Sequence, residues 1–260
     1  MMELTARDVT VFRDGRNIVD RVSATLTPGM FVAMVGANGA GKSTLLSCLA
    51  GLLKPDAGEV TLDGRAVTEI DRRDIARRRA YLPQNPRAEW PISVERVVAL
   101  GLTPHLPAFG GLPGGFEPRL TQAIEACGLA EHRFQPATTL SGGELARAML
   151  ARALIGDPEV VLVDEPTSGL DPKHGLDTVA RLQRLALSEG RLVVATIHDL
   201  TLAARHATHL MALRDGKLIA FAPVAEALTP DLLRQVFDVE AAVTGSGRAT
   251  YVDYLSPSNI

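Results

Sequence analysis

The chain has 260 residues, of which 46% are hydrophobic and 22% charged, so it can form one large domain or two small ones around a sizeable core. A formal net charge of −3 gives no reason to expect binding to nucleic acid, and the two cysteines lack the spacing of a metal site and fit a reducing compartment. No run of about 18 apolar residues is present to cross a membrane and the N-terminus lacks a signal-peptide core, so we expect a cytoplasmic protein that could sit against a membrane protein.

The first part of the chain is predicted to be rich in β-strands. Residues 4–35 contain the apolar runs Val9–Phe12 and Val22–Leu26, which flank a turn at Asp14-Gly15. The run Phe31–Val35 is continuously apolar, as expected for a strand that is buried on both faces.

A glycine-rich turn follows this buried strand and precedes a segment with helical spacing of its apolar residues. The pattern is G-x-x-x-x-G-K-[ST], formed by Gly36, Ala37, Asn38, Gly39, Ala40, Gly41, Lys42, Ser43 and Thr44. The glycines let backbone N–H groups point at an anion, and the next helix adds the positive end of its dipole. We expect Lys42 to bind outer phosphates and the Ser43 hydroxyl to ligate Mg²⁺. A glycine-rich turn with a surface lysine is the weaker alternative, because residue types, spacing and flanking elements all agree with phosphate binding.

The next segment is predicted to contain a hairpin and a charged helix. The strand Glu59–Leu62 meets the turn Asp63-Gly64. Residues 71–79 hold five arginines, which favours a solvated helix face, with a contact patch as the alternative. A short strand at Ala80–Leu82 ends at a proline.

Residues 85–140 change character because prolines and glycines become frequent. Between them lie two helical segments, Val94–Leu100 and Leu120–Cys127. We expect a helical insertion with a flexible loop at residues 103–118 rather than a continuation of the sheet.

Two later apolar runs, Val160–Val163 and Leu192–Ile197, are predicted to be buried parallel strands separated by helices. Ligands of open parallel sheets bind beyond the carboxyl ends of the strands. Asp164 could there hold Mg²⁺, Glu165 could polarise a water, and His198 could contact a terminal phosphate. The alternatives are acids that cap the next turn and a purely structural histidine.

The sequence Ser141-Gly142-Gly143-Glu144 precedes a helical run and has the spacing of a capping box. Two glycines in a first helical turn are poor helix formers, yet they would let an anion approach the exposed N–H groups. The glycine-rich turn at Gly36–Thr44, a P-loop, already surrounds its own phosphates. A second anion site therefore suggests a nucleotide supplied by another subunit.

Weaker signals follow in the C-terminal part of the chain. Residues 210–221 are predicted to be a hairpin with an Asp215-Gly216 turn, and Asp199 is expected to cap a helix. Thr229-Pro230 is predicted to start the last helix, with threonine at the N-cap.

Together these motifs resemble the ATP-binding subunit of ABC transporters. Gly36 to Ser43 resembles Walker A, Gln84 the Q-loop glutamine, and Leu140–Glu144 the signature motif. The run ending in Asp164 and Glu165 resembles Walker B with its catalytic glutamate, Ser168–Asp171 the D-loop, and His198 the switch histidine. Six motifs in the order of the family span roughly residues 4 to 225.

The resemblance implies an α/β fold: a P-loop ATPase core with a mainly parallel central sheet, an N-terminal antiparallel β subdomain and an inserted helical subdomain of about residues 85–155, all in one domain over residues 1–260. It also implies a head-to-tail homodimer that binds two ATP molecules, each between Walker A of one subunit and Ser141, Gly143 and the D-loop Asp171 of the other. Glu165, His198 and Gln84 would serve catalysis, and Ser43, Asp164 and Gln84 would bind magnesium.

The implied partners are an integral-membrane permease and a periplasmic or extracellular solute-binding protein, with no nucleic acid. The subunit would lie on the cytoplasmic face of the inner membrane. The sequences around residues 98–105, 198–204 and 228–233 look like those of the iron-siderophore, haem and cobalamin importers, with Leu102 in place of a common arginine. Importers of other metals or small solutes are the alternative.

Two positions depart from the pattern of the family. Where the family has an aromatic residue that stacks on adenine, a gapless alignment places Arg13 beside Phe12, so either could contact the base. After Glu144 the family often has polar glutamines, whereas Leu145 and Ala146 follow here.

Two rival functions start from the same P-loop. A soluble ABC ATPase of translation or DNA repair usually has two cassettes or a long coiled coil, and this chain has neither. A small-molecule kinase would explain Walker A and Asp164 but not the motif Ser141–Glu144 or His198.

Overall fold

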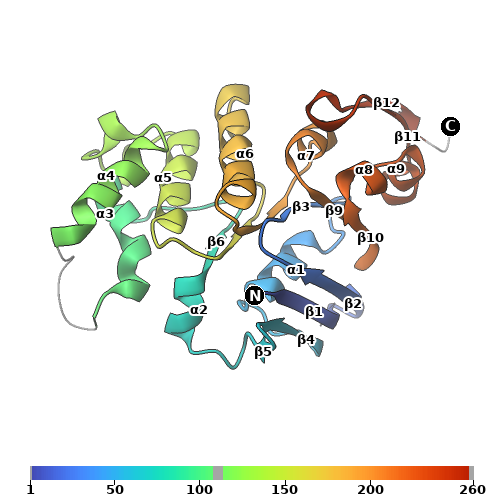
Figure 1. Cartoon of the computed structure of the whole chain (residues 1–260), viewed down its shortest axis with the longest axis horizontal. Helices are drawn as coiled ribbons and strands as arrows, with labels where there is room; N and C mark the ends of the chain where they lie inside the picture. The colour runs from blue at the N-terminus through green and yellow to red at the C-terminus, as the bar shows by residue number, and fades with distance from the viewer. Residues whose placement is uncertain (1, 108–113, 258–260) are drawn as a thin grey trace.

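The computed structural model describes residues 2–107 and 114–257 and arranges its strands in three sheets (Figure 1). The first sheet has the strand order β2-β1-β4-β5 and is antiparallel throughout. Its strands are β1 (Leu4–Arg13), β2 (Arg16–Leu26), β4 (Ala57–Leu62) and β5 (Arg65–Ala66). The predicted turns at Asp14-Gly15 and Asp63-Gly64 join neighbouring antiparallel strands, so these hairpins are confirmed.

The central sheet has six strands in the order β10-β9-β3-β8-β7-β6. Only β9 and β10 pair in antiparallel fashion, through the predicted Asp215-Gly216 turn. The other neighbours are parallel, so the prediction of a mainly parallel sheet is confirmed. The strands are β3 (Phe31–Val35), β6 (Arg79–Leu82), β7 (Val160–Val163), β8 (Leu192–Thr196), β9 (His209–Arg214) and β10 (Lys217–Pro223).

Strand β3 shows why the apolar runs are continuous, because it is buried on both faces. Phe31, Ala33 and Val35 belong to a core shared with the helices α6 (Pro172–Leu187) and α7 (Leu200–His206). Val32 and Met34 belong to a second core, which the antiparallel sheet and α1 (Lys42–Leu49) complete. Alternating side chains of β3 therefore pack into two different cores, one on each face of the central sheet.

A group of helices lies to one side of the sheets, at the left of Figure 1. Its members α3 (Val94–Ala99), α4 (Glu117–Glu125) and α5 (Gly142–Leu154) share a separate apolar core that includes Val98, Ile124 and Ala148. Short 3₁₀ turns connect them at Leu100–His105, Gly114–Phe116, Ala130–His132 and Ala137–Thr139. The predicted loop at 103–118 was wrong at both ends, because a 3₁₀ turn runs to His105 and α4 begins at Glu117, where Pro118 fits the first helical turn. Residues 108–113 of that predicted loop lie outside the described residues.

The arginine-rich segment forms the helix α2 (Arg72–Arg78), which has no buried residue, as a solvated face requires. Its arginines also form contacts within the chain. Arg73 and Arg77 donate to the carbonyl of Pro104, and Arg78 pairs with Asp63 and Glu159. The solvated helix face is therefore confirmed, and the contact patch stays a prediction.

The C-terminal part contains α8 (Val224–Ala227), α9 (Pro230–Phe237) and a hairpin of β11 (Val239–Thr244) and β12 (Tyr251–Pro257) with a 3₁₀ turn at Gly247–Ala249. The Thr229 cap of α9 is confirmed, since its hydroxyl accepts from the N–H of Leu232. The hairpin was not predicted. It is fixed to α7, where Arg205 donates to the carbonyl of Thr250 and the hydroxyl of Thr201 accepts from the N–H of Val252. None of the helices in the described ranges combines the length and apolar character needed to span a bilayer.

Candidate functional site

Three neighbouring parallel strands bring the predicted site residues to one sheet edge. Strand β8 lies between β3 and β7, and all three run in the same direction. The glycine-rich turn follows β3, Asp164 and Glu165 follow β7, and His198 follows β8. The predicted common edge is therefore confirmed.

The glycine-rich turn folds closely against its neighbours and requires glycine at two positions. A Cβ atom at Gly36 would lie 2.3 Å from the carbonyl oxygen of Leu213, and one at Gly41 would lie 2.3 Å from that of Ile18. Gly41 also has a φ of 95°, a left-handed conformation, at the N-cap of α1. Any side chain at these positions would displace the loop from the start of the helix.

Lys42 is buried beneath this turn, with 7% of its surface exposed. Its ammonium nitrogen donates to the carbonyl oxygens of Gly36 (2.7 Å) and Ala37 (2.9 Å). Burial lowers the pKa of Lys42, while the charges of Glu165 and Asp164 raise it in part. The lysine is thus held by the loop and is acted on by the charges of the two carboxylates. Asn38 and Gly39 at the tip of the turn are exposed, as is Ser43, and Thr44 is half-buried.

Thr196 at the end of β8 organises both acidic residues. Its hydroxyl donates to Asp164 Oδ1 at 2.7 Å and accepts from the backbone N–H of Glu165, also at 2.7 Å. Thr196 is fully buried and Asp164 is 6% exposed, so water does not compete for the first contact. Glu165 itself has a φ of 49°, which is uncommon for a residue with a side chain. Sequence reasoning missed Thr196, although it is the one polar residue in the apolar run Leu192–Ile197.

Glu165 forms hydrogen bonds with both Gln84, the predicted Q-loop glutamine, and His198, the predicted switch histidine. Gln84 donates its amide Nε2 to Glu165 Oε2 at 2.6 Å, and His198 Nε2 lies 2.7 Å from Glu165 Oε1. Both oxygens of the carboxylate are therefore held by hydrogen bonds. This three-residue cluster brings together all the residues that were predicted to serve catalysis.

The segment Ser141–Glu144 lies beside the predicted D-loop. Ser141 and Glu144 form the expected capping box, and a Cβ atom at Gly143 would lie 3.4 Å from the side chain of Leu170. Asp171 caps α6 by accepting from the N–H of His174, a contact that lowers the pKa of Asp171. Among the described residues, no hydrogen bond joins the capping-box residues to the glycine-rich turn of the same chain.

The two adenine candidates differ in their surroundings. Phe12 at the end of β1 is 51% exposed. The guanidinium of Arg13 donates to the carbonyl of Phe12 (2.6 Å) and to Asp56 (3.1 Å). Both side chains are about half exposed, but the guanidinium of Arg13 is engaged by Asp56 whereas the ring of Phe12 is not.

A cavity of about 350 Å³ lies beside the segment that leads to Gln84, between β6 and α5. Three arginines, Arg79, Arg87 and Arg152, line it without an acidic side chain among the lining residues. Two guanidinium nitrogens of Arg79, Nε and Nη1, are buried with no hydrogen-bond partner among the described residues, and burial lowers the pKa of Arg79. Such buried donors are costly unless a partner satisfies them.

Comparison with known sequences gives a consistent picture. The sequence model of the family described as ABC transporter matches residues 19–168. The hemin import ATP-binding protein HmuV of Bordetella bronchiseptica is 40% identical over 253 residues, which cover 93% of this chain and 94% of that protein. The iron(3+)-hydroxamate import ATP-binding protein FhuC of Bacillus subtilis is 35% identical over 248 residues, 95% of this chain and 92% of that protein. The cobalamin import ATP-binding protein BtuD of Halobacterium salinarum is 39% identical over 98% of this chain, which spans 63% of its length.

Solved structures agree with the observed fold. A dimeric bacterial ABC transporter cassette is 27% identical, with a TM-score of 0.73 over 85% of this chain and 98% of the other. An inward-facing ABC transporter assigned to the metal-chelate type is similar in fold, with a TM-score of 0.82 and 23% identity over 98% of both chains.

Proposed function

The chain belongs to the ABC transporter family, and from this we propose that it hydrolyses ATP to drive import of an iron chelate (haem or a siderophore) or cobalamin through a separate permease. ATP binding is a property of the family domain. The cargo proposal rests on relatives named for hemin, hydroxamate and cobalamin import, which are 35–40% identical over most of this chain.

The observation that carries the hydrolytic function is the position of Glu165 between Gln84 and His198, at the same sheet edge as Lys42. A carboxylate at this edge can accept a proton from a water that attacks the terminal phosphate of ATP. His198 orients the carboxylate through its Nε2, and when ATP binds the same N–H could donate to a phosphate oxygen instead. Lys42 supplies the positive charge, since its ammonium only has to exchange the Gly36 and Ala37 carbonyls for phosphate oxygens.

The residues at this edge also suit magnesium. The Ser43 hydroxyl at the start of α1, the Asp164 carboxylate and the amide oxygen of Gln84 are the hard oxygen ligands that Mg²⁺ prefers. When bound, the cation would neutralise charge on the outer phosphates. Thr196 holds Asp164 in place for this role.

The second half of each ATP site would come from another copy of the chain. Ser141 and Gly143 stand at the N-terminus of α5 beside the D-loop residue Asp171, without a hydrogen bond to the chain's own P-loop among the described residues. A helix N-terminus with glycine in its first turn binds anions readily. A head-to-tail homodimer would place this end against the partner's triphosphate. Phe12 is the better adenine contact, because the guanidinium of Arg13 is already paired with Asp56.

The permease would dock over the arginine-lined cavity beside Gln84. The guanidinium nitrogens of Arg79 that have no partner within residues 2–107 and 114–257 suit a carboxylate or a carbonyl of the permease. Contact at this point adjoins the Gln84–Glu165 hydrogen bond, so docking and hydrolysis would be linked. The subunit would thus be peripheral on the cytoplasmic face of the inner membrane, and a periplasmic or extracellular solute-binding protein would deliver the cargo. Residues 1–260 would form a single ABC ATPase domain, with residues 85–155 as its helical subdomain.

Affinity purification of the tagged chain from membranes tests this assignment. An integral-membrane permease encoded beside the chain is the expected partner, together with Mg²⁺-dependent ATP hydrolysis. Purification with ribosomes or DNA would contradict it, as would phosphate transfer to an acceptor other than water.

A further inference from the structure

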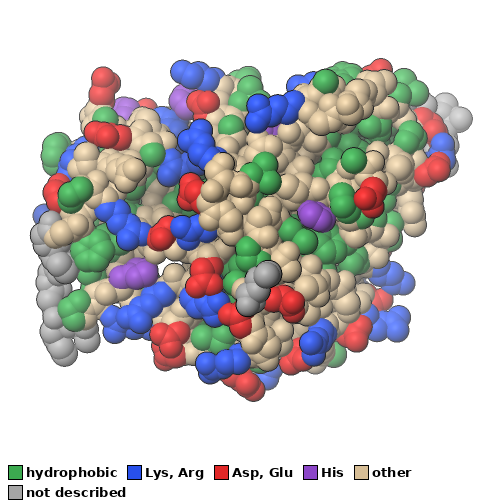
Figure 2. Space-filling model, in the orientation of Figure 1, with side chains coloured by type: hydrophobic (Ala, Val, Ile, Leu, Met, Phe, Trp, Pro, Cys, Tyr) green, Lys and Arg blue, Asp and Glu red, His purple; other side chains and the backbone are tan. Residues whose placement is uncertain are grey.

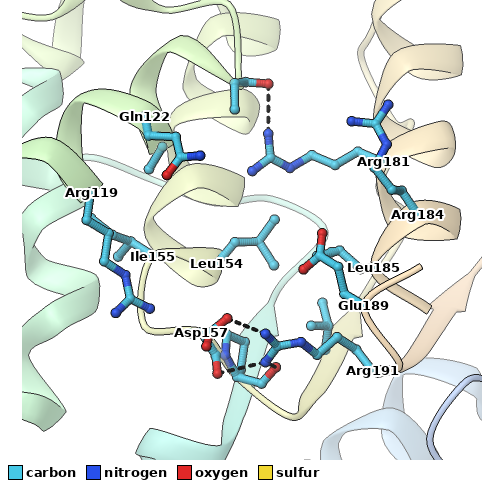
Figure 3. A pocket seen from close by; sticks show the side chains of 14 residues that line it. Arg119, Gln122, Leu154, Ile155, Asp157, Arg181, Arg184, Leu185, Glu189 and Arg191 are labelled. Atoms are coloured by element: carbon cyan, nitrogen blue, oxygen red, sulfur yellow. Dashed lines mark hydrogen bonds and ion pairs between the residues drawn. The ribbon is translucent and has the colours of Figure 1, made fainter. Parts of the chain in front are cut away.

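A basic groove separates α6 from the helices α4 and α5 and extends from the first turn of α6 to its C-terminal half. It consists of two adjoining cavities of about 310 and 550 Å³, which share Ala126, Arg181 and Arg184 in their walls. We call this the α6 groove. Figure 3 shows its first cavity, with Arg119 and Gln122 on the α4 side and Arg181 and Arg184 on the α6 side.

Positive charge dominates the walls of the α6 groove. Six Lys and Arg residues line it, against three acids: Arg119, Arg147, Lys173, Arg181, Arg184 and Arg191 against Asp157, Asp177 and Glu189. Arg191 is the one lining cation that forms an ion pair within the described residues, with Asp157 at the lower end of the cavity (Figure 3). Figure 2 shows Lys and Arg side chains gathered where α5 faces α6.

Two arginines of the groove have buried donors without an acceptor. The Nε atoms of Arg147 and Arg181 are inaccessible to solvent and have no hydrogen-bond partner among the described residues. Arg181 Nη1 donates a hydrogen bond to the carbonyl oxygen of Ala126 at 2.7 Å. This contact holds the guanidinium of Arg181 in the groove (Figure 3). Both guanidinium groups act on Cys127, where burial raises the thiol pKa and the two positive charges lower it in part. These unsatisfied donors on facing helices cost free energy, which an acceptor in the groove would recover once either side chain turns toward it.

We propose that the α6 groove binds a small anion of the phosphate class, which joins α6 to α4 and α5. Guanidinium groups match the oxygens of phosphate in paired hydrogen bonds, and a divalent or trivalent anion would balance the excess of three positive charges in the groove. A cavity of about 310 Å³ has the size of a small-molecule site, and the arginines in its walls favour an anionic ligand.

Binding there would have a consequence for the candidate ATP site. Helix α5 starts at the capping box of Ser141 and contributes Arg147 to the groove, while α6 starts at the Asp171 cap. An anion between them would fix the orientation of the two helix starts that we assign to the partner's nucleotide. The groove would therefore regulate how readily the dimer closes, without taking part in hydrolysis.

Calorimetric titration with pyrophosphate tests the proposal. The titration uses a Lys42→Ala background, in which the competing P-loop site is removed. A stoichiometry of two pyrophosphates per chain instead of one would show that the P-loop still binds. The stoichiometry therefore distinguishes a failure of the P-loop assignment from a failure of the groove proposal. Arg184→Gln and Arg119→Gln change exposed side chains on opposite walls, and Arg65→Gln in β5 is the matched control. Inorganic phosphate and AMP as further titrants distinguish free phosphate from a nucleotide as the natural source.

We expect one pyrophosphate per chain in the background. Each groove variant should weaken binding about tenfold, as for loss of one charge-assisted hydrogen bond, while Arg65→Gln stays within about twofold. Arg184→Lys should recover part of the affinity because it keeps the charge. Absence of binding in the background, or equal affinity in all variants, would overturn the proposal.

Discussion

Replacing Thr196 by valine tests the most specific feature of the site, the hydroxyl that holds both acidic residues. Valine has nearly the same shape as threonine, so the change removes the hydroxyl and leaves its buried partners unsatisfied. Asp164 Oδ1 then loses a 2.7 Å hydrogen bond in a fully buried position, and the N–H of Glu165 loses its acceptor.

The magnitude follows from these two contacts. A hydrogen bond to a charged group contributes about 1.5–3 kcal/mol, and an unsatisfied buried N–H costs about 1–3 kcal/mol. Because the two contacts share one hydroxyl and their contributions are not additive, we expect a net loss of about 2–4 kcal/mol in the free energy of unfolding. For a chain of this length that corresponds to a fall in Tm of about 5–15 °C.

Catalysis should suffer more than binding. Glu165 needs its unusual backbone conformation, which the Thr196 contact supports, so kcat should fall about tenfold to a hundredfold, equivalent to roughly 1.4–2.8 kcal/mol. The dissociation constant for ATP without Mg²⁺ should stay within about twofold, since Lys42 and the glycine-rich turn are unchanged.

Thermal unfolding and steady-state ATP hydrolysis measure both effects. Thr196→Ser keeps the hydroxyl and should recover most of kcat. Thr61→Val is the matched control, because Thr61 is also buried (5% exposed, against 0% for Thr196) but lies in the antiparallel sheet. If Thr196→Val hydrolyses ATP at the wild-type rate, or if Thr61→Val has the same effect, the positioning role of Thr196 is refuted.

Four further predictions concern separate parts of the molecule. Glu165→Gln should bind ATP, lose hydrolysis and elute as a dimer in gel filtration with ATP; a monomer that hydrolyses normally would refute its role as base. Lys42→Ala should lose triphosphate affinity by at least about tenfold in equilibrium dialysis, and unchanged affinity would count against the phosphate role. Arg79→Met should unfold at the same temperature or higher but no longer copurify with the permease, whereas retained copurification would disprove the docking site. Burial raises the pKa of the Cys48 thiol to about 11, so a thiol reagent at pH 8 should label Cys48 only after unfolding and, in the folded chain, only as the pH approaches 11; rapid labelling at pH 8 would contradict this burial.

The sequence was most informative where local chemistry and fold require the same residues. The glycine-rich turn, the strand ends at Asp164 and His198 and the caps at Ser141 and Asp199 could all be located, because each depends on neighbours within a few positions. The continuous apolar runs predicted parallel strands for the same reason.

Features that depend on distant segments could not be predicted in the same way. The contact of Thr196 with Asp164 joins residues 32 positions apart. Threonine is common in β-strands, so its presence at the end of β8 does not by itself indicate a contact with an acidic residue. The Gln84–Glu165 hydrogen bond spans 81 positions. The hairpin of β11 and β12 has weak strand signals and is held by contacts to α7 instead. Proline in α4 suggested a loop, although at the first turn it favours a helix.

Uptake into proteoliposomes tests the central proposal most directly. The chain is reconstituted with the permease encoded beside it and the matching binding protein, and ATP-dependent accumulation of haem, a ferric hydroxamate and cobalamin is measured in parallel. We predict that one of the three accumulates with Mg²⁺ and ATP and that Glu165→Gln abolishes its uptake. Hydrolysis of ATP without accumulation of any of the three would contradict the assignment.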